Sequence, residues 1–332
     1  MKKESEKSLI LKKRHKAFEV GGKRRPEKIR RLFHFRGALQ GSVGRLSLIS
    51  MGSPFSFDRT LDMKTPEYIR GFKNAPAPLV CLTAYSAPMA AALDASCDVL
   101  LVGDSLGTAL YGMDNTLGVT LEMMIAHGKA VVRTAKSACV VVDMPYGTYE
   151  GSPGQAYESA SRIMDETGCA AVKLEGGADM EAIIAHLVRQ DVPVMGHIGL
   201  QPQSVIKDGG YKVKGKSNTE VSKLLEDAYA VERAGAFSVV IEGTVEPVAR
   251  NITQSIGIPT IGIGASAACD GQILVSEDML GMTPGHVPKF VKPYADIAGE
   301  IARAVEAYAR DVRSRAFPDA DYVYGVKKQV ES

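Results

Sequence analysis

The chain has 332 residues, of which 45% are hydrophobic, enough for one large α/β domain or two of ordinary size. This composition excludes a disordered or fibrous protein. The formal net charge of +2 conceals an uneven distribution, because residues 1–50 hold 15 Lys or Arg against 4 Asp or Glu, which gives +11 there and −9 in the remainder.

Residues 1–62 form a basic N-terminal segment that differs from the rest of the chain. Its Lys and Arg clusters, such as KKRHK and GGKRRPEKIRR, could bind nucleic acid or a membrane surface. The segment lacks regular apolar periodicity and leads into MGSPFSF, which is typical of a disordered extension or of a misassigned start upstream of Met51 or Met63. We therefore expect a disordered basic extension over residues 1–62 and one catalytic domain over residues 63–332.

We expect neither a membrane span nor a secretion signal in this sequence. No run approaches the roughly 20 apolar residues that cross a bilayer, and the N-terminus lacks the apolar segment and cleavage site of a signal peptide. The five cysteines are spread singly, without CxxC spacing. This pattern favours reduced thiols in a cytoplasmic protein over disulfides or a zinc site.

From residue 79 onward, short β-branched runs alternate with amphipathic helical stretches. The runs predict strands at residues 79–85, 99–105, 139–145, 170–176, 193–199, 237–243, 259–265 and 272–278. Helical patterns lie between them at residues 121–135, 155–168, 180–190 and 221–235, and several end on Gly, a helix C-terminal signal. Only the short segment SAACDG joins the last two strands, and a final helix is predicted at about 293–316.

This alternation of strands and helices predicts an α/β protein, and specifically a (β/α)8 TIM barrel. Parallel strands joined by right-handed crossovers close naturally into that form. An open doubly wound sheet is the competing arrangement. Such a sheet usually has a GxGxxG turn after its first strand, and CLTAYSAPM has none.

Polar side chains stand at the ends of the predicted strands, and in a parallel barrel these ends converge on the rim that carries catalytic groups. They are Thr83, Tyr85, Asp104, Ser105, Asp143, Lys173, Glu175, His197 and Glu242. Any single acid at such a position could be a helix cap or a turn residue. Four carboxylates with one lysine, however, would repel one another unless a cation joined them. Because no Cys or His cluster accompanies them, the oxygen ligands indicate Mg²⁺ rather than Zn²⁺.

A Mg²⁺ ion held by two protein carboxylates has open positions that the carbonyl and carboxylate oxygens of a 2-keto acid could fill. This chelation polarises the carbonyl and stabilises an enolate formed by proton loss from the adjacent carbon. A separate carboxylate must accept that proton. Glu242, alone on the sixth strand in the apolar run VVIEG, suits this role.

Several long strings, in order through about residues 64–310, resemble those of one enzyme family. They are GDSLG, TLGVTLEMMIAHGKAV, VKLEGG, GHIGLQPQS followed by GGYKVKGK, GIGAS, DGQILV and HVPKF. The family is ketopantoate hydroxymethyltransferase, also called 3-methyl-2-oxobutanoate hydroxymethyltransferase. The resemblance implies transfer of a one-carbon unit from 5,10-methylenetetrahydrofolate to 2-oxoisovalerate, which gives ketopantoate in the first step of pantothenate biosynthesis. It also implies a (β/α)8 barrel, Mg²⁺, and a cytoplasmic homo-oligomer, commonly a decamer.

The resemblance further implies roles for individual residues. Asp104 of GDS and Asp143 of the third strand would bind the metal and lie among the substrate-binding residues. Glu175 of VKLEG would join the metal shell, directly or through water. Ser105, and Lys173 of the same VKLEG motif, would hold the carboxylate of the keto acid.

On the catalytic side, the resemblance makes Glu242 the proton acceptor, as the strand-end reasoning does. His197 in GHIG is either a hydrogen-bonding residue of the active site or a strand-end histidine with structural partners. The chain departs from the family pattern at Met113, where many members have histidine, and at Ser266, where many have glycine. These departures bear on the folate side and on the loop after the seventh strand.

Two alternatives remain open at this point. The first is another Mg²⁺-dependent barrel enzyme of enolate chemistry, such as a phosphoenolpyruvate mutase or an isocitrate lyase-like carbon–carbon lyase. Those enzymes typically place a cysteine-bearing loop above the metal, whereas the residues after Asp143, YGTYEGSPGQA, contain no cysteine. The second is a nucleic-acid-binding protein that acts through its basic arm, although we expect neither a nucleic-acid nor a membrane partner.

Overall fold

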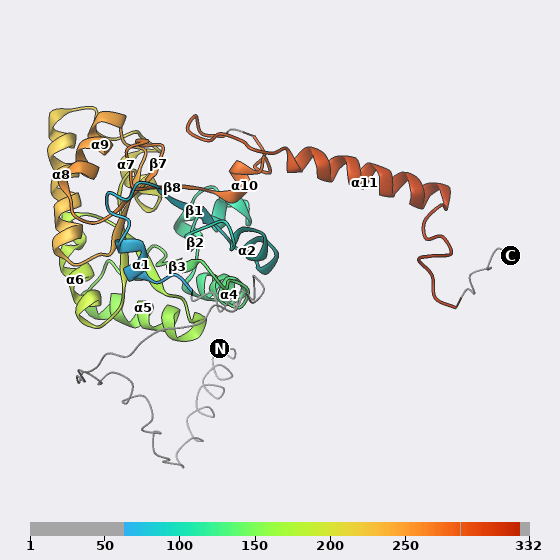
Figure 1. The fold of residues 1–332 in the computed structure, drawn as a ribbon, viewed down its shortest axis with the longest axis horizontal. Helices are drawn as coiled ribbons and strands as arrows, with labels where there is room; N and C mark the ends of the chain where they lie inside the picture. The colour runs from blue at the N-terminus through green and yellow to red at the C-terminus, as the bar shows by residue number, and fades with distance from the viewer. Residues whose placement is uncertain (1–62, 286, 326–332) are drawn as a thin grey trace, which may run out of the picture. The chain divides into compact units, whose positions relative to one another are not determined.

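The computed structural model describes residues 63–285 and 287–325, and it contains a closed barrel of parallel strands in the order β1 to β8 (Figure 1). The strands are β1 (Leu79–Thr83), β2 (Val99–Val102), β3 (Cys139–Asp143), β4 (Ala171–Glu175), β5 (Val194–Gly199), β6 (Ser238–Glu242), β7 (Thr260–Ile263) and β8 (Gly271–Leu274). Pairing of β1 with β8, with Leu79 opposite Gly271, closes the ring. The predicted (β/α)8 barrel is therefore confirmed, whereas the expectation for residues 1–62 lies outside the described residues.

Helices follow most of the strands and pack around the barrel, except for the last helix, which projects away from it (Figure 1). They are α1 (Pro66–Arg70), α2 (Ala87–Leu93), α3 (Leu106–Ala109), α4 (Leu121–Val132), α5 (Pro153–Thr167), α6 (Glu181–Arg189), α7 (Val205–Asp208), α8 (Asn218–Arg233), α9 (Glu246–Ser255), α10 (Ser276–Met279) and α11 (Ile297–Ser314). Short 3-10 helices are η1 (Thr116–Gly118), η2 (Ala178–Met180) and η3 (Pro202–Ser204). None of the helices in the described part of the chain is both long and apolar enough to cross a membrane.

Strands β2 and β3 are apolar up to their ends because both of their faces are buried. In β2, Val99 and Leu101 belong to the apolar cluster inside the barrel. Leu100 and Val102, which point the other way, belong to the cluster between the strands and the surrounding helices. A side chain facing either direction is thus removed from water, and the strand needs no polar position before its end.

Local signals in the sequence set the boundaries of the helices. In α5 the Ser152 hydroxyl caps the first turn by accepting a hydrogen bond from the Gln155 amide, and Pro153 stands at the first helical position. Gly168 ends the same helix in the left-handed conformation, with φ of 75°, and leads directly towards β4. These turns fix where each strand begins, and so which residue reaches its C-terminal end.

The last βα unit differs from the others, as the short SAACDG segment indicated. The chain passes from β7 to β8 through residues 264–270 without a helix. After β8 and the short α10, the chain reaches the predicted final helix, α11, in which no residue is buried. The C-terminal rim of the barrel is consequently bordered after β7 by bends and turns, and after β8 by the four-residue helix α10, rather than by long helices.

Candidate active site

The predicted site residues lie together at the C-terminal ends of the strands. One cavity of about 890 Å³ is lined by Asp104, Ser105, Asp143, Lys173, Glu175, His197 and Glu242, among others. The barrel therefore brings together, from β2 through β6, every residue that the sequence singled out for metal, substrate or proton chemistry. Their roles remain predictions, and their geometry defines what they can do.

Asp104 and Asp143 form the centre of this cluster, and both are buried. The Asp104 amide donates a hydrogen bond of 3.0 Å to Asp143 Oδ2, and Lys173 Nζ lies 3.0 Å from Asp143 Oδ1. Glycine at position 103 leaves room for the Ser105 side chain, since a Cβ there would lie 2.8 Å from Ser105 Oγ. The strand consequently ends at Val102, three residues before its predicted end, and the chain turns at Gly103 to direct the next two side chains into the cavity.

A neutral side chain, Gln203 in η3, connects two of the acids. Its Nε2 donates to Asp104 Oδ2 at 2.8 Å, while its backbone amide donates to Glu175 Oε2 at 3.0 Å. The Tyr149 hydroxyl donates to Gln203 Oε1 at 2.6 Å and thereby fixes the orientation of the amide. Sequence reasoning missed Gln203 because it is uncharged and lies in a loop, although it is part of the unusual string GHIGLQPQS.

His197 and Glu242 form the second polar centre of the cavity. His197 Nδ1 lies 3.3 Å from Lys173 Nζ, and His197 Nε2 lies 3.2 Å from Glu242 Oε2. Burial, followed by the nearby charge of Lys173, lowers the pKa of His197 and favours the neutral imidazole. A neutral ring that accepts from Lys173 at Nδ1 carries its proton on Nε2, facing Glu242. His197 thus forms a hydrogen bond with Lys173 inside the cavity, whereas its Nε2 faces Glu242 without a hydrogen-bond partner.

The remaining strand-end residues support Ser105 or lie outside the reactive cluster. Tyr85 is buried, and its hydroxyl lies 2.7 Å from Ser105 Oγ. The Thr83 hydroxyl accepts from the Ser276 amide at 3.0 Å and so helps to hold β1 against the start of α10. His127 Nδ1 lies 2.6 Å from the Tyr85 carbonyl oxygen, so this histidine helps to hold the chain after β1.

The cluster carries more negative than positive charge, and burial makes the ionised form of its carboxyl groups less favourable. Burial raises the pKa of Asp143 to about 7 despite the adjacent Lys173, and it raises the pKa of Asp104 and of Glu175 as well. For Lys173, burial alone would lower the pKa, but the charges of Asp143, Asp104 and Glu175 outweigh it and raise the pKa. A further cation in this cavity would stabilise the ionised carboxylates.

The donor set fits a hard divalent ion. Glu175 Oε1 is buried without a hydrogen-bond partner, and carboxylate oxygens are ligands that Mg²⁺ prefers. Within residues 63–285 and 287–325, no three His, Cys, Asp or Glu side chains are grouped as ligands of one ion. An ion at Asp104 and Asp143 would therefore complete its shell with water and substrate oxygens, which is usual for Mg²⁺. This arrangement leaves Glu175 a water-mediated place in the shell.

The two departures from the family pattern lie away from the acidic cluster. The Ser266 hydroxyl, in the loop between β7 and β8, donates to Glu246 Oε1 at 2.8 Å and accepts from the Ala268 amide at 3.0 Å. Met113 packs near Gly107 and Gly118, where its sulfur lies 3.3 Å and 3.4 Å from the Cβ positions built on these glycines. Neither side chain lines the cavity.

Comparisons with known proteins agree with these observations. Residues 63–320 match the family model described as ketopantoate hydroxymethyltransferase. A protein of Rhizobium etli is 59% identical over 260 residues, covering 78% of this chain and 95% of its own length. One of Mesorhizobium japonicum is 60% identical over 262 residues, covering 79% and 91%. Both are named 3-methyl-2-oxobutanoate hydroxymethyltransferase.

Solved structures support the fold alone, because their sequences are distant. A phosphonopyruvate hydrolase structure is 14% identical with a TM-score of 0.52, covering 78% of this chain and 90% of its own. A second structure of a phosphonopyruvate hydrolase, in complex with oxalate and Mg²⁺, is 12% identical with a TM-score of 0.51 and covers 78% and 93%. The family model and the close relatives go further, and from them it follows that this chain belongs to the ketopantoate hydroxymethyltransferase family.

Proposed function

We propose that this protein transfers a hydroxymethyl group from 5,10-methylenetetrahydrofolate to 2-oxoisovalerate (3-methyl-2-oxobutanoate), giving ketopantoate in the first step of pantothenate biosynthesis. Family membership supports the substrates. The observation that carries the chemistry is the convergence of Asp104, Asp143, Lys173 and Glu242 on one cavity. Together they could hold a cation, a carboxylate and a carbon acid in one place.

Mg²⁺ is the proposed metal, and Asp104 and Asp143 are the residues that would hold it, with Glu175 contributing through water. When bound, the ion would supply Lewis-acid polarisation of the substrate's keto group. The Gln203 side-chain amide donates a hydrogen bond of 2.8 Å to Asp104 Oδ2. Supporting hydrogen bonds of this kind orient metal ligands and commonly affect metal affinity.

Ser105 and Lys173 are proposed to bind the carboxylate of the keto acid. Tyr85 holds the Ser105 hydroxyl at 2.7 Å, and the buried Lys173 ammonium is kept charged by the surrounding acids. A hydroxyl and an ammonium in the same cavity suit an anionic group, since hydrogen bonds to charged partners are stronger than neutral ones. This binding would orient the substrate so that C3 faces the next strand.

Glu242 is the proposed base that removes the C3 proton. Its side chain is 18% exposed and belongs to β6, so it is less buried than the acids of β2 to β4. His197 Nε2, at 3.2 Å from Glu242 Oε2, would orient the carboxylate. After proton transfer, C3 forms the new carbon–carbon bond with the one-carbon unit of the folate, and water supplies the hydroxyl oxygen in the net reaction.

A direct assay tests this function. The full-length protein is incubated with 2-oxoisovalerate, 5,10-methylenetetrahydrofolate and Mg²⁺, and ketopantoate is measured by mass spectrometry. We expect ketopantoate and tetrahydrofolate to appear in equal amounts, and only when the metal is present. Absence of ketopantoate from a folded, Mg²⁺-loaded sample would refute the proposal.

We further propose that the protein acts in the cytoplasm as a homo-oligomer, commonly a decamer in this family. All five cysteines are free thiols, which suits a reducing compartment. The exposed apolar side chains of α11, which include Ile301, Val305 and Tyr308, support self-association. Equilibrium sedimentation of the purified protein tests the assembly, and a monomer at micromolar concentration would contradict it.

A further inference from the structure

Three hydroxyl groups on the chain after β2 belong to residues that line the cavity, namely Ser105, Thr108 and Thr116. Two of these hydroxyls have partners. The Ser105 hydroxyl lies 2.7 Å from the Tyr85 hydroxyl, and the Thr108 hydroxyl donates to the Ser105 carbonyl oxygen at 3.0 Å. The Thr116 hydroxyl, by contrast, is buried without a hydrogen-bond partner among the described residues. Thr116 therefore has an unused proton donor in the cavity.

Local structure holds Thr116 in place at the start of η1. The Asn115 side chain caps this turn by accepting a hydrogen bond of 3.0 Å from the Leu117 amide, and the Val119 amide donates to the Thr116 carbonyl oxygen at 3.1 Å. A β-branched side chain has few rotamers. The fixed backbone consequently leaves the Thr116 hydroxyl few directions in which to donate.

Packing brings η1 close to the residues that end β2. It lies beside α3, the short helix that follows Ser105, and beside η3, which carries Gln203. At Gly107 in α3 a Cβ would lie 2.7 Å from Val119 Cγ2, so glycine at this position allows the close approach. The turn that carries Thr116 is therefore next to the two segments that hold the acids of the cluster.

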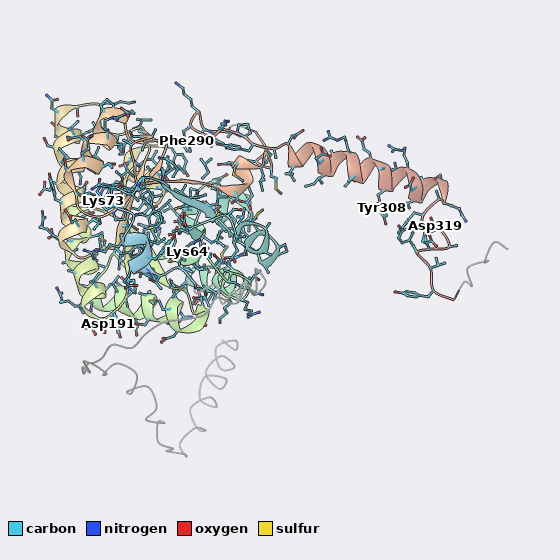
Figure 2. The ribbon with its side chains drawn as sticks, in the orientation of Figure 1. Lys64, Lys73, Asp191, Phe290, Tyr308 and Asp319 are labelled. Atoms are coloured by element: carbon cyan, nitrogen blue, oxygen red, sulfur yellow. The ribbon has the colours of Figure 1, made fainter. Side chains whose placement is uncertain are left out.

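Thr116 lies in the enclosed part of the cavity. It is 3% exposed, and Asp104, Asp143 and Lys173 are similarly buried. The lining is more open at Phe290, on the chain between α10 and α11, which keeps 39% of its surface exposed (Figure 2). A ligand atom that contacts the Thr116 hydroxyl should therefore belong to a molecule bound at the acidic cluster.

The carboxylate of the keto acid needs more partners than the side chains of Ser105 and Lys173 supply. A carboxylate has two oxygens with about four sites for donors or a cation. A hydroxyl has one proton, and two of the three Lys173 N–H groups have acceptors in reach, since Nζ lies 3.0 Å from Asp143 Oδ1 and 3.3 Å from His197 Nδ1. Each of the two side chains can thus contribute about one hydrogen bond. With a cation at a third site, one site remains.

We infer that the Thr116 hydroxyl binds the carboxylate of 2-oxoisovalerate and completes its set of partners with Ser105 and Lys173. This inference rests on the proposed function, which makes this keto acid the substrate. A buried hydroxyl without a partner is unfavourable, whereas a hydrogen bond to an anionic oxygen is strong. The hydroxyl should consequently stabilise the complex with the keto acid and contribute nothing to the stability of the free protein.

Thr116→Val tests this inference, because valine has nearly the shape of threonine but no hydroxyl. Thr116→Ser keeps the hydroxyl. Thr134→Val is the matched control, since the Thr134 hydroxyl donates to the Ala130 carbonyl oxygen at 3.1 Å and the residue does not line the cavity. For each full-length protein, the Kd of 2-oxoisovalerate is measured by calorimetry at saturating Mg²⁺. The midpoint of thermal unfolding is measured with and without the keto acid.

We expect Thr116→Val to raise the Kd of the keto acid about 10- to 100-fold, the range for a hydrogen bond to a charged group. Without the keto acid, its unfolding midpoint should equal or exceed that of the wild type, because no hydrogen bond within the protein is lost. Added keto acid should raise this midpoint less than it raises that of the wild type. Thr116→Ser and Thr134→Val should keep the Kd within about threefold of wild type.

The outcomes separate this inference from the proposed function. An unchanged Kd in Thr116→Val would overturn the inference and leave the proposed function standing. A lower unfolding midpoint without the keto acid would also overturn it, because the hydroxyl would then hold the fold. Weaker Mg²⁺ binding in the absence of the keto acid would overturn it too, by assigning the hydroxyl to the metal shell. If the wild-type protein neither binds the keto acid nor forms ketopantoate, the proposed function fails, and this inference fails with it.

Discussion

Replacing Gln203 with methionine would remove a buried amide of similar length from the acidic cluster. The variant loses the 2.8 Å hydrogen bond to Asp104 Oδ2 and the 3.1 Å hydrogen bond to the Met144 carbonyl oxygen. The Tyr149 hydroxyl loses its acceptor but still has the Glu175 carbonyl oxygen at 3.2 Å, so it is not left without a partner. The main effect should therefore be on the orientation of Asp104 rather than on the fold.

The size of this effect follows from the charge of the acceptor. A hydrogen bond to an ionised group contributes about 1.5 to 3 kcal/mol, which corresponds to roughly 10- to 100-fold in an equilibrium constant. Loss of a residue that supports a metal ligand commonly weakens metal binding by a similar factor, about 10- to 100-fold. We expect the Mg²⁺ concentration for half-maximal ketopantoate formation to rise by that amount in Gln203→Met.

The assay is a Mg²⁺ titration of ketopantoate formation at saturating keto acid and folate, with thermal unfolding measured in parallel. Gln201→Met is the matched control, because Gln201 lies two residues away and its side-chain oxygen accepts a long hydrogen bond of 3.5 Å from the Ser204 hydroxyl. A Mg²⁺ requirement in Gln203→Met within about twofold of the control would refute the supporting role assigned to this amide.

Four further predictions follow from the site and the fold. Glu242→Gln should abolish C3 proton exchange while keto acid binding, measured by calorimetry, stays within about threefold of wild type; undiminished exchange would remove Glu242 from the role of base. Asp143→Ala should lower Mg²⁺ affinity by at least about tenfold in a calorimetric titration, and unchanged affinity would refute the assignment of Asp143 as a Mg²⁺ ligand. Burial raises the pKa of Cys97 to about 11, so its thiol should resist alkylation in the folded protein up to about pH 9, and rapid labelling at pH 8 would contradict this. The contribution of this thiol to the free energy of unfolding should decline as the pH rises towards 11. A variant that begins at Met63 should retain transferase activity, whereas its loss would support a function of the basic segment.

Much of the barrel was predictable because both faces of most of its strands are buried and short aliphatic runs mark these strands. The runs at β2 and β3 identified the strands correctly, and the acids that end them were placed at the rim by the rule for parallel barrels. The predicted strand ends were late by up to a few residues where the chain turns towards the cavity, as at Gly103. At these strand ends, contacts with other strands decide the conformation of a residue, and the local amino-acid pattern does not predict such contacts.

The contacts between loops could not be predicted from the sequence. Gln203 contacts Asp104 across ninety-nine positions of the chain. Because its side chain is neutral, no charge pattern in the sequence identifies Gln203 as a residue of the site. Tyr85 was grouped with the rim residues because it ends a strand, yet it is buried beneath Ser105 and acts through that hydroxyl. Residue type and spacing indicate which groups could react, whereas the partners that orient them depend on the closed barrel.

Closure of the barrel between β1 and β8 has a consequence for how the chain reaches its native state. Leu79 must pair with Gly271, so the first strand cannot find its second neighbour until nearly the whole domain has left the ribosome. Pairings this distant in sequence slow folding, and until they form both outer strands present unpaired backbone edges. We therefore expect the unpaired edges of β1 and β8 to cause chaperone dependence and aggregation during rapid synthesis. A circular permutant that joins the two strands directly in sequence should fold faster.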